Sequence, residues 1–192
     1  MMELLQFLES IHPMSDGLKQ HLAVTLKVKQ LPKKEYLLKA GHVSRNICFI
    51  AQGLLRCFYI KDDHEVSSWF MKEGDVIVSV ESFFSQTPSY ESIQALEDCL
   101  LYYITYDELQ FIYRNFSEFN FIGRVLLERY YMLSEQRLYS IRMQSAEERY
   151  HHLLQHFPDI IQRVSTTDIA SYLGVSRETL SRTKSRTIKK IL

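Results

Sequence analysis

Residues 166–182 read TTDIASYLGVSRETLSR and have the spacing of two short helices joined by a tight turn. Ala170 is small enough for the helices to cross closely, and Gly174, four residues later, permits the turn. Four apolar side chains supply the buried side of both helices: Ile169, Leu173, Val175 and Leu180. The segment therefore predicts a helix-turn-helix, with Thr167 capping the first helix and Ser176 capping the second.

The second of these helices carries side chains suited to DNA. Its N-terminal turns present four polar residues where a recognition helix touches base edges in the major groove: Arg177, Glu178, Ser181 and Arg182. Arg can bind guanine O6 and N7 in a bidentate fork, and Glu can accept from cytosine N4. Basic residues further along suit phosphates: Lys184, Arg186, Lys189 and Lys190. A helical hairpin with a solvated basic face would explain the turn, but not this Arg-Glu-x-x-x-Arg pattern.

The charge distribution favours the same partner. Residues 1–150 carry 16 Lys and Arg against 20 Asp and Glu, a net charge of −4. Residues 151–192 carry 7 against 3, a net charge of +4, so the total of zero hides a basic C-terminal part. A basic segment of this kind favours a polyanion such as double-stranded DNA.

The residues before this segment predict a long helix over 118–143, with Gly123 as its weak point. Its length would be about 39 Å at 1.5 Å per residue. An apolar and aromatic stripe from Ile122 to Ile141 is wider than one sheet would cover, which favours a homodimer through this helix. Packing inside its own domain is the alternative. Ser145-Ala146-Glu147-Glu148 has the pattern of a capping box that starts a new helix, so a hinge is expected at 143–145, and Pro158 should close that helix.

The N-terminal half predicts an antiparallel β-sandwich or roll. Leu26 and Val28 alternate with lysines, and short β-branched and aromatic runs follow at 47–50, 54–60, 66–71, 76–80, 92–96 and 100–104. Helices flank the strands. The first 24 residues are predicted to be helical, with their first run ending at Pro13, and another helix is predicted after the N-cap Thr105. The expected fold class is α+β. The expected domains are a jelly-roll-type β-roll over 1–117, a dimerisation helix and hinge over 118–144, and the helix-turn-helix over 145–192.

Composition excludes several classes of protein. The chain has 192 residues, of which 46% are hydrophobic and 24% charged, which is typical of a globular protein. No apolar run approaches the roughly 20 residues of a membrane span, and the N-terminus lacks the pattern of a signal peptide, so a cytoplasmic location is expected. Cys48, Cys57 and Cys99 are too scattered for a disulfide framework or a metal knuckle. They are expected to be buried thiols, and we predict no metal and no cofactor.

The helical lead, the glycine-punctuated strands, the long helix and the Leu-Gly-Val-Ser-Arg-Glu-Thr-Leu-Ser-Arg segment at 173–182 together resemble the CRP/FNR family of bacterial transcription regulators. Gly41, Gly53 and Gly74 fall where that family places turn glycines. The resemblance implies that Arg177, Glu178 and Arg182 occupy the base-reading positions of the cyclic AMP receptor protein. Glu178, Ser181 and Arg182 also match the reading set of the oxygen-sensing branch. The resemblance further implies a homodimer on an inverted repeat with a TGA-like core in each half-site, with RNA polymerase as a possible further partner.

The sequence departs from the family at its cyclic-nucleotide cassette. Aligned without gaps from Gly74, the family's Gly-Glu and Arg-Ser pairs fall on Val78-Ser79 and Ser89-Tyr90, and no Lys or Arg occurs between Lys72 and Arg114. A buried phosphate without a cation is costly, so we predict no useful affinity for cyclic AMP or cyclic GMP. An effector would lie between the roll and the long helix, near five residues: Ser79, Glu81, Ser89, Tyr90 and Ser134. A dimer that is competent without any effector is an equal alternative.

Other departures and alternatives concern the ends of the chain and its metal chemistry. Family members usually add a β-hairpin wing after the recognition helix, whereas this sequence stops at Leu192, so a short form is expected.

An iron-sulfur cluster is not expected, because the first cysteine is Cys48. A haem would need an axial ligand such as His21, His42 or His64. A metal-dependent cupin enzyme would need a His-x-His pair that His42, His64 and His151-His152 do not supply, so no enzyme is expected. A β-roll that binds a ligand or protein, with a tail that does not read DNA, is the remaining alternative.

Overall fold

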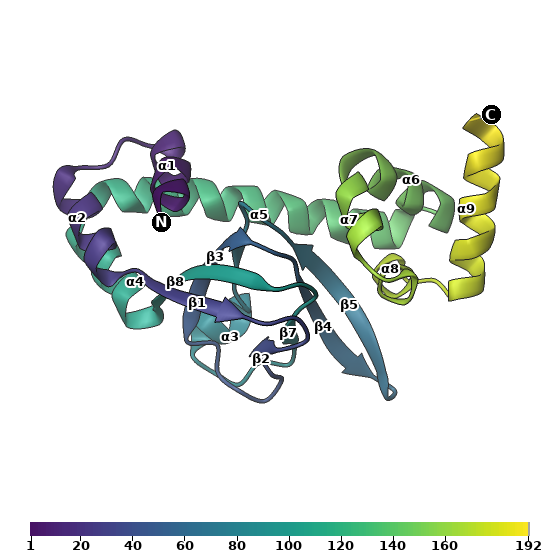
Figure 1. Cartoon of the computed structure of the whole chain (residues 1–192), viewed down its shortest axis with the longest axis horizontal. Coiled ribbons are helices and arrows are strands. Elements are labelled where there is room, and N and C mark those ends of the chain that lie inside the picture. Colours follow the sequence, from purple (N-terminus) through teal and green to yellow (C-terminus); the bar gives the residue numbers. More distant parts are fainter. Residues whose placement is uncertain (192) are drawn as a thin grey trace.

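The computed structural model describes residues 1–191, with side chains described for residues 1–186. Two four-stranded antiparallel sheets form a roll (Figure 1). One sheet has the order β1 (Lys27–Leu31), β8 (Cys99–Thr105), β3 (Asn46–Gln52) and β6 (Val76–Ile77). The other has the order β2 (Tyr36–Leu38), β7 (Ser92–Ala95), β4 (Leu55–Lys61) and β5 (His64–Met71). The predicted α+β class with an antiparallel roll is confirmed.

Apolar side chains from both sheets pack into one core between them. Its buried members are Leu31, Leu38, Cys48, Ile50, Leu55, Cys57, Ile77, Ile93, Ala95, Cys99 and Leu101. Burying each large apolar side chain contributes roughly 1.5–3 kcal/mol. The three cysteines are free and buried, as predicted, and burial raises the pKa of Cys48 to about 12.

Helices cover the end of the roll near the N-terminus. α1 (Met2–Ile11) and α2 (Asp16–Thr25) are separated at Pro13, and the hydroxyl of Ser15 caps α2 by accepting a hydrogen bond from the Leu18 backbone N–H at 3.2 Å. α4 (Tyr106–Asn115) begins with a capping box between Thr105 and Glu108, which confirms the predicted N-cap. These helices bury leucines of α1 and α2 against Phe49 of β3 and the start of α5.

The longest helix, α5 (Ser117–Met143), matches the predicted span to within a residue. Its first half closes the roll: Ile122 is fully buried, and the Tyr130 hydroxyl accepts a hydrogen bond from the Val76 backbone N–H at 2.7 Å. Gly123 is needed where it lies, because a Cβ there would come 2.6 Å from the Tyr113 hydroxyl oxygen. Its second half extends past the roll toward the C-terminal helices (Figure 1).

Four helices follow: α6 (Ala146–His156), α7 (Pro158–Arg163), α8 (Thr166–Leu173) and α9 (Arg177–Ile191). Ser145 and Glu148 form the predicted capping box, and Gln144 before them is extended. Pro158 does not end α6, which stops at His156; it is the first residue of α7, where its missing N–H costs nothing. Among the described residues, no helix combines the length and apolar character that crossing a membrane requires.

Two elements of the roll differ from the sequence prediction. The run at 76–80 forms a strand only at Val76–Ile77, and Val80 begins a short helix, α3 (Val80–Ser85). The three-residue strand β2 had no counterpart among the predicted strands. Strand β2 lies at the edge of its sheet, beside β7.

Candidate functional site

The C-terminal helices form the predicted helix-turn-helix. The turn between α8 and α9 passes through Gly174 at φ +66°, a left-handed conformation that favours glycine. The Val175 backbone N–H donates to the Ala170 carbonyl at 3.0 Å and closes the turn. Ile169 and Leu180 are each 1% exposed, so both helices bury the apolar face that the sequence predicted.

One predicted cap is wrong and one is confirmed. The hydroxyl of Ser165, not Thr167, accepts the hydrogen bond that caps α8, from the Asp168 backbone N–H at 3.1 Å. Thr167 lies inside the first turn of α8 and is exposed. Helix α8 therefore begins two residues earlier than the sequence predicted. Ser176 caps α9 as predicted, accepting from the Thr179 backbone N–H at 3.2 Å.

The four predicted base-reading side chains share one exposed face at the start of α9. Arg177, Glu178, Ser181 and Arg182 are all exposed, and none of them forms an ion pair within the described part of the chain. A hydrogen bond from its own backbone N–H, followed by one with Ser176, lowers the pKa of Glu178, so this carboxylate is charged at neutral pH. These side chains are thus available to an external partner.

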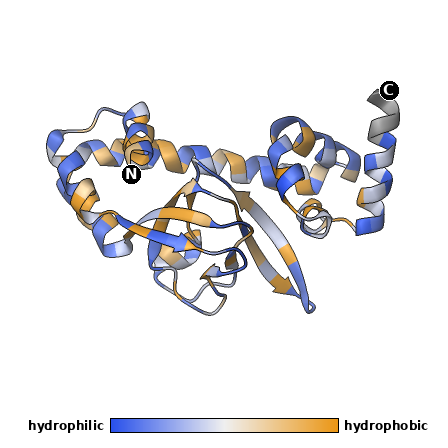
Figure 2. Ribbon diagram, viewed as in Figure 1, coloured by the Kyte–Doolittle hydropathy of each residue, from blue (hydrophilic) through white to orange (hydrophobic). Residues whose placement is uncertain are grey.

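The predicted phosphate contacts continue along α9. Arg186 is exposed and Lys184 is half-buried, and the described part of α9 is mainly hydrophilic in Figure 2. The side chains of Lys189 and Lys190 lie outside the described residues.

A buried arginine joins the helix-turn-helix to the roll. Arg56 of β4, 4% exposed, forms ion pairs with Asp168 of α8 and Glu65 of β5. We call these three residues the Arg56 cluster. Beside it, the Ser171 hydroxyl accepts from the Ser67 backbone N–H and donates to the Glu65 carbonyl, both at 2.9 Å. Helix α8 thus lies against the β4–β5 hairpin.

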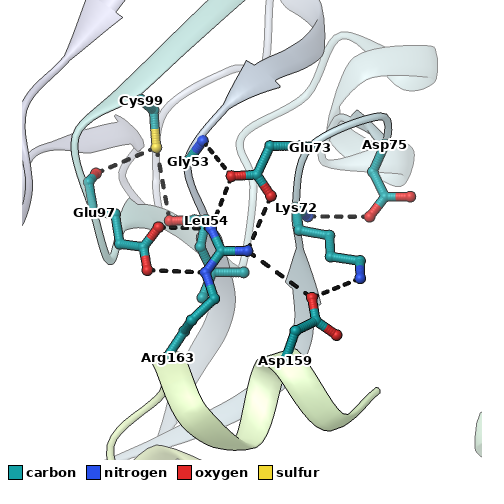
Figure 3. A network of polar contacts seen from close by, with 9 residues as sticks. All are labelled: Gly53, Leu54, Lys72, Glu73, Asp75, Glu97, Cys99, Asp159 and Arg163. Atoms are coloured by element: carbon teal, nitrogen blue, oxygen red, sulfur yellow. Dashed lines mark hydrogen bonds and ion pairs between the residues drawn. The ribbon is translucent and has the colours of Figure 1, made fainter. Parts of the chain in front are cut away.

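A second charged cluster joins α7 to two turns of the roll (Figure 3). The Arg163 guanidinium donates to the Glu73 carboxylate at 2.9 Å and to the Glu97 carboxylate at 2.6 and 3.0 Å. Hydrogen bonds to Glu97 and then Glu73 raise the pKa of Arg163. Lys72 pairs with Asp159 at 2.6 Å nearby.

Two further arginines connect the helix-turn-helix to the end of α5. The Arg137 guanidinium lies 3.7 Å from the centre of the Tyr172 ring and donates to the Tyr172 carbonyl. Arg149 bridges the hinge, donating to the Gln144 carbonyl at 2.5 Å and to the Leu173 carbonyl at 2.9 Å. These contacts could not be predicted from the sequence, because their partners are backbone atoms or residues far away in the chain.

A cavity of about 430 Å³ lies between the roll and α5. Glu81, Tyr90 and Ser134 line it, as the sequence placed them. Ser79 and Ser89 do not: they are buried, with their hydroxyl oxygens 2.9 Å apart in a mutual hydrogen bond. That these two serines replace the acid and the arginine of the family's cassette stays a prediction from the sequence. The sequence prediction missed most of the lining, including Glu91 and Trp69; Glu91 follows Tyr90 directly, which was the available signal.

Metal-binding arrangements are missing from the described residues, where no three His, Cys, Asp or Glu side chains come together to hold an ion. The histidines considered as haem ligands do not fit that role. His42 and His64 are exposed, and His21 stacks on Phe111 with ring centres 4.9 Å apart. None of the three lines the cavity.

Comparisons with known proteins identify a matching domain family and solved structures of similar fold. Residues 28–116 match the model of the cyclic nucleotide-binding domain. FixK2 from Bradyrhizobium japonicum is similar, with a TM-score of 0.72 and 17% identity over 86% of this chain and 85% of that one. A CooA mutant from Carboxydothermus hydrogenoformans has a TM-score of 0.71 and 21% identity over 92% and 80%.

A protein from Eubacterium rectale, described as a transcriptional regulator of the Crp/Fnr family, has a TM-score of 0.70 and 16% identity over 92% of this chain and 85% of its own. None of the curated proteins compared with this sequence matches it. Residues 28–116 thus match the cyclic nucleotide-binding domain, and the described chain as a whole shares its fold with these three proteins.

Proposed function

We propose that this protein is a transcription regulator that binds a palindromic DNA operator as a homodimer and does not respond to cyclic AMP. The observation that carries the proposal is the exposed face of Arg177, Glu178, Ser181 and Arg182 at the start of α9. These residues begin the second helix of a helix-turn-helix, the part that enters the major groove. Arg and Glu side chains there can distinguish G·C pairs by their hydrogen-bonding groups.

The surface of α5 supports the homodimer. Apolar side chains recur at spacings of four and three residues, the pattern of a two-helix seam: Leu127, Tyr131, Leu138 and Ile141, with Ser134 between them. We call these five residues the α5 seam. Tyr131 is 67% exposed and Ile141 53% in the single chain, so a second copy would bury them. The seam shares only Ile141 with the predicted stripe, and Ile122 and Tyr130 of that stripe pack on the roll instead. The other predicted members of the stripe were Val125, Leu126, Arg129, Leu133, Arg137 and Tyr139.

The cavity supports the lack of response to cyclic AMP. Where a cyclic-nucleotide cassette would present a cation to the phosphate, Ser89 hydrogen-bonds Ser79. No Lys or Arg is among the described residues that line the cavity, while Glu81 and Glu91 are. An unpaired phosphate in such a site would pay for desolvation and meet two carboxylates.

Selection of bound DNA from a random library by the purified, ligand-free protein tests the proposal. We expect enrichment of a two-fold symmetric site, lost in Arg177→Ala and Arg182→Ala. Arg114→Ala is the matched control, because it removes the same exposed charge from α4, outside the helix-turn-helix. Calorimetric titration with cyclic AMP should show no binding at micromolar concentration.

Two results would contradict the proposal. Enriched sites without two-fold symmetry would refute the homodimer on a palindrome. Binding that is equally weak for every sequence and unchanged in both variants would favour the alternative, a β-roll module with a basic tail that does not read DNA.

A further inference from the structure

The cavity beside α5 is enclosed by many elements and is not an open surface face. Its walls come from β3 and β8 of one sheet, β4 and β5 of the other, the helices α1 and α2, and α5. Its volume of about 430 Å³ falls in the range of small-molecule sites. A helix of a second chain would lie along the exposed side of α5 and cannot fill a space that reaches between the two sheets.

Most of the lining is apolar or aromatic. Rings and aliphatic chains contribute the larger part, including Trp69, Met71, Phe84, Tyr90, Leu127 and Tyr130. Burial of an apolar ligand here would gain roughly 25 cal/mol for each Å² of apolar surface removed from water. The lining therefore favours a molecule with a hydrophobic, ring-sized body.

The charged groups in the cavity all have one sign. Glu81 and Glu91 are the ionisable acids of the described lining, which contains no Lys, Arg or His. Burial raises the pKa of Glu91, against the effect of a hydrogen bond with Ser79. Burial first, then the carboxylates of Glu91 and Glu81, raises the pKa of Tyr90. Anionic ligands are disfavoured by this field.

We propose that the cavity binds a largely apolar small molecule that carries no negative charge and donates a hydrogen bond to the Glu91 carboxyl. Leu127 and Ser134 belong both to the cavity wall and to the α5 seam, so a bound ligand would contact residues of the proposed dimer interface. A role of this ligand as an effector therefore rests on the proposed regulator function. The binding itself does not depend on DNA.

Two fluorescent probes that differ by one charge test the ligand class. The first is 1-anilinonaphthalene, which is neutral, apolar and carries one N–H donor. The second is its 8-sulfonate, the same ring system with a negative charge. Trp69, the one tryptophan of the chain, lines the cavity, so a probe bound here must receive energy transfer from it, and the variants at Glu91 and Glu81 place the probe in the cavity. We expect saturable one-to-one binding of the neutral probe with transfer from Trp69, and at least ten-fold weaker binding of the sulfonate.

Isosteric variants identify the carboxyl group that makes the cavity prefer the neutral probe over the sulfonate. Glu91→Gln should reduce the preference for the neutral probe at least three-fold, and Glu81→Gln should reduce it in the same direction if Glu91→Gln fails to fold. Glu35→Gln, an exposed acid outside the lining, should leave the preference unchanged.

Equal or tighter binding of the sulfonate would overturn the inference, as would binding without energy transfer from Trp69. The outcome is separable from that of the DNA experiment. Protein that binds the neutral probe but enriches no DNA sequence would keep this inference and refute the regulator proposal. Protein that selects an operator but binds neither probe would do the reverse.

Discussion

Replacing Asp168 with Ala tests how strongly the helix-turn-helix is held to the roll. The change removes one partner of the Arg56 guanidinium, whose side chain is 5% exposed, and leaves it with Glu65 alone. Breaking a fully buried pair costs about 3–5 kcal/mol. Asp168 is 18% exposed and Glu65 remains, so we expect a smaller loss of about 2 kcal/mol in the free energy of unfolding. For a chain of this size that corresponds to a fall of about 4–8 °C in Tm.

Thermal unfolding followed by circular dichroism measures the effect. Asp159→Ala is the matched control: it removes the same side chain from the same interface, but from a pair in which both partners are more than a third exposed, so it should cost under about 1 kcal/mol. Adding Arg56→Met to Asp168→Ala should restore part of the loss, because it removes the buried charge left without its partner. A loss in Asp168→Ala no larger than in the control, with no rescue in the double variant, would refute this account of the Arg56 cluster.

Three further predictions concern acid stability, assembly and the turn. Burial opposes the ionised form of Glu73, but hydrogen bonds from Arg163 and from backbone N–H groups lower its pKa from 4.5 to about 2. It therefore stabilises the fold above pH 4.5, and this contribution is lost as pH falls from 4.5 through about 2. With the side chain 41% exposed we expect about 1 kcal/mol, seen in urea titrations at pH 7 as a difference from Glu73→Gln that shrinks below pH 4.5 and vanishes below about pH 2. If the protein forms the proposed homodimer, Leu138→Asp should raise its dissociation constant about 100-fold in sedimentation experiments by burying a charge in the α5 seam, whereas Gln136→Asp, off the seam, should not. Gly174→Ala should cost about 1 kcal/mol in chemical denaturation, because φ +66° strains any residue with a Cβ; an unchanged midpoint would show that the turn adjusts.

The sequence correctly predicted those turns and helix caps that depend only on neighbouring residues. Gly174, Ser176 and the Ser145 capping box are each decided by neighbouring residues, and all three were found. The start of α3 was missed because Val76 to Val80 is a run of β-branched residues typical of a strand, and Ser79, the N-cap position of α3, lies within that run. Strand β2 is held by pairing with β7, more than fifty residues away, and its three residues carry little pattern of their own.

In the candidate site, too, features set by local spacing could be predicted, and contacts between distant residues could not. The exposed face of α9 follows from helical spacing alone, so the sequence was sufficient to place its four residues. The contact of Arg56 with Asp168 joins residues 112 positions apart, and no local rule brings them together. The cavity was placed near the right residues, but the mutual hydrogen bond of Ser79 and Ser89 turned two of them away from it.

The hinge between α5 and α6 is short and is bridged by Arg149, while Arg137 holds Tyr172 of α8. This leaves α9 little freedom to swing about the end of α5. In a dimer built on such hinges, the spacing of the two DNA half-sites would be set by the protein and not by the operator. One inserted base pair moves a half-site by 3.4 Å and turns it by about 35° around the duplex. A rigid pair of recognition helices cannot follow both displacements, so the operators of this protein should share one fixed spacer length.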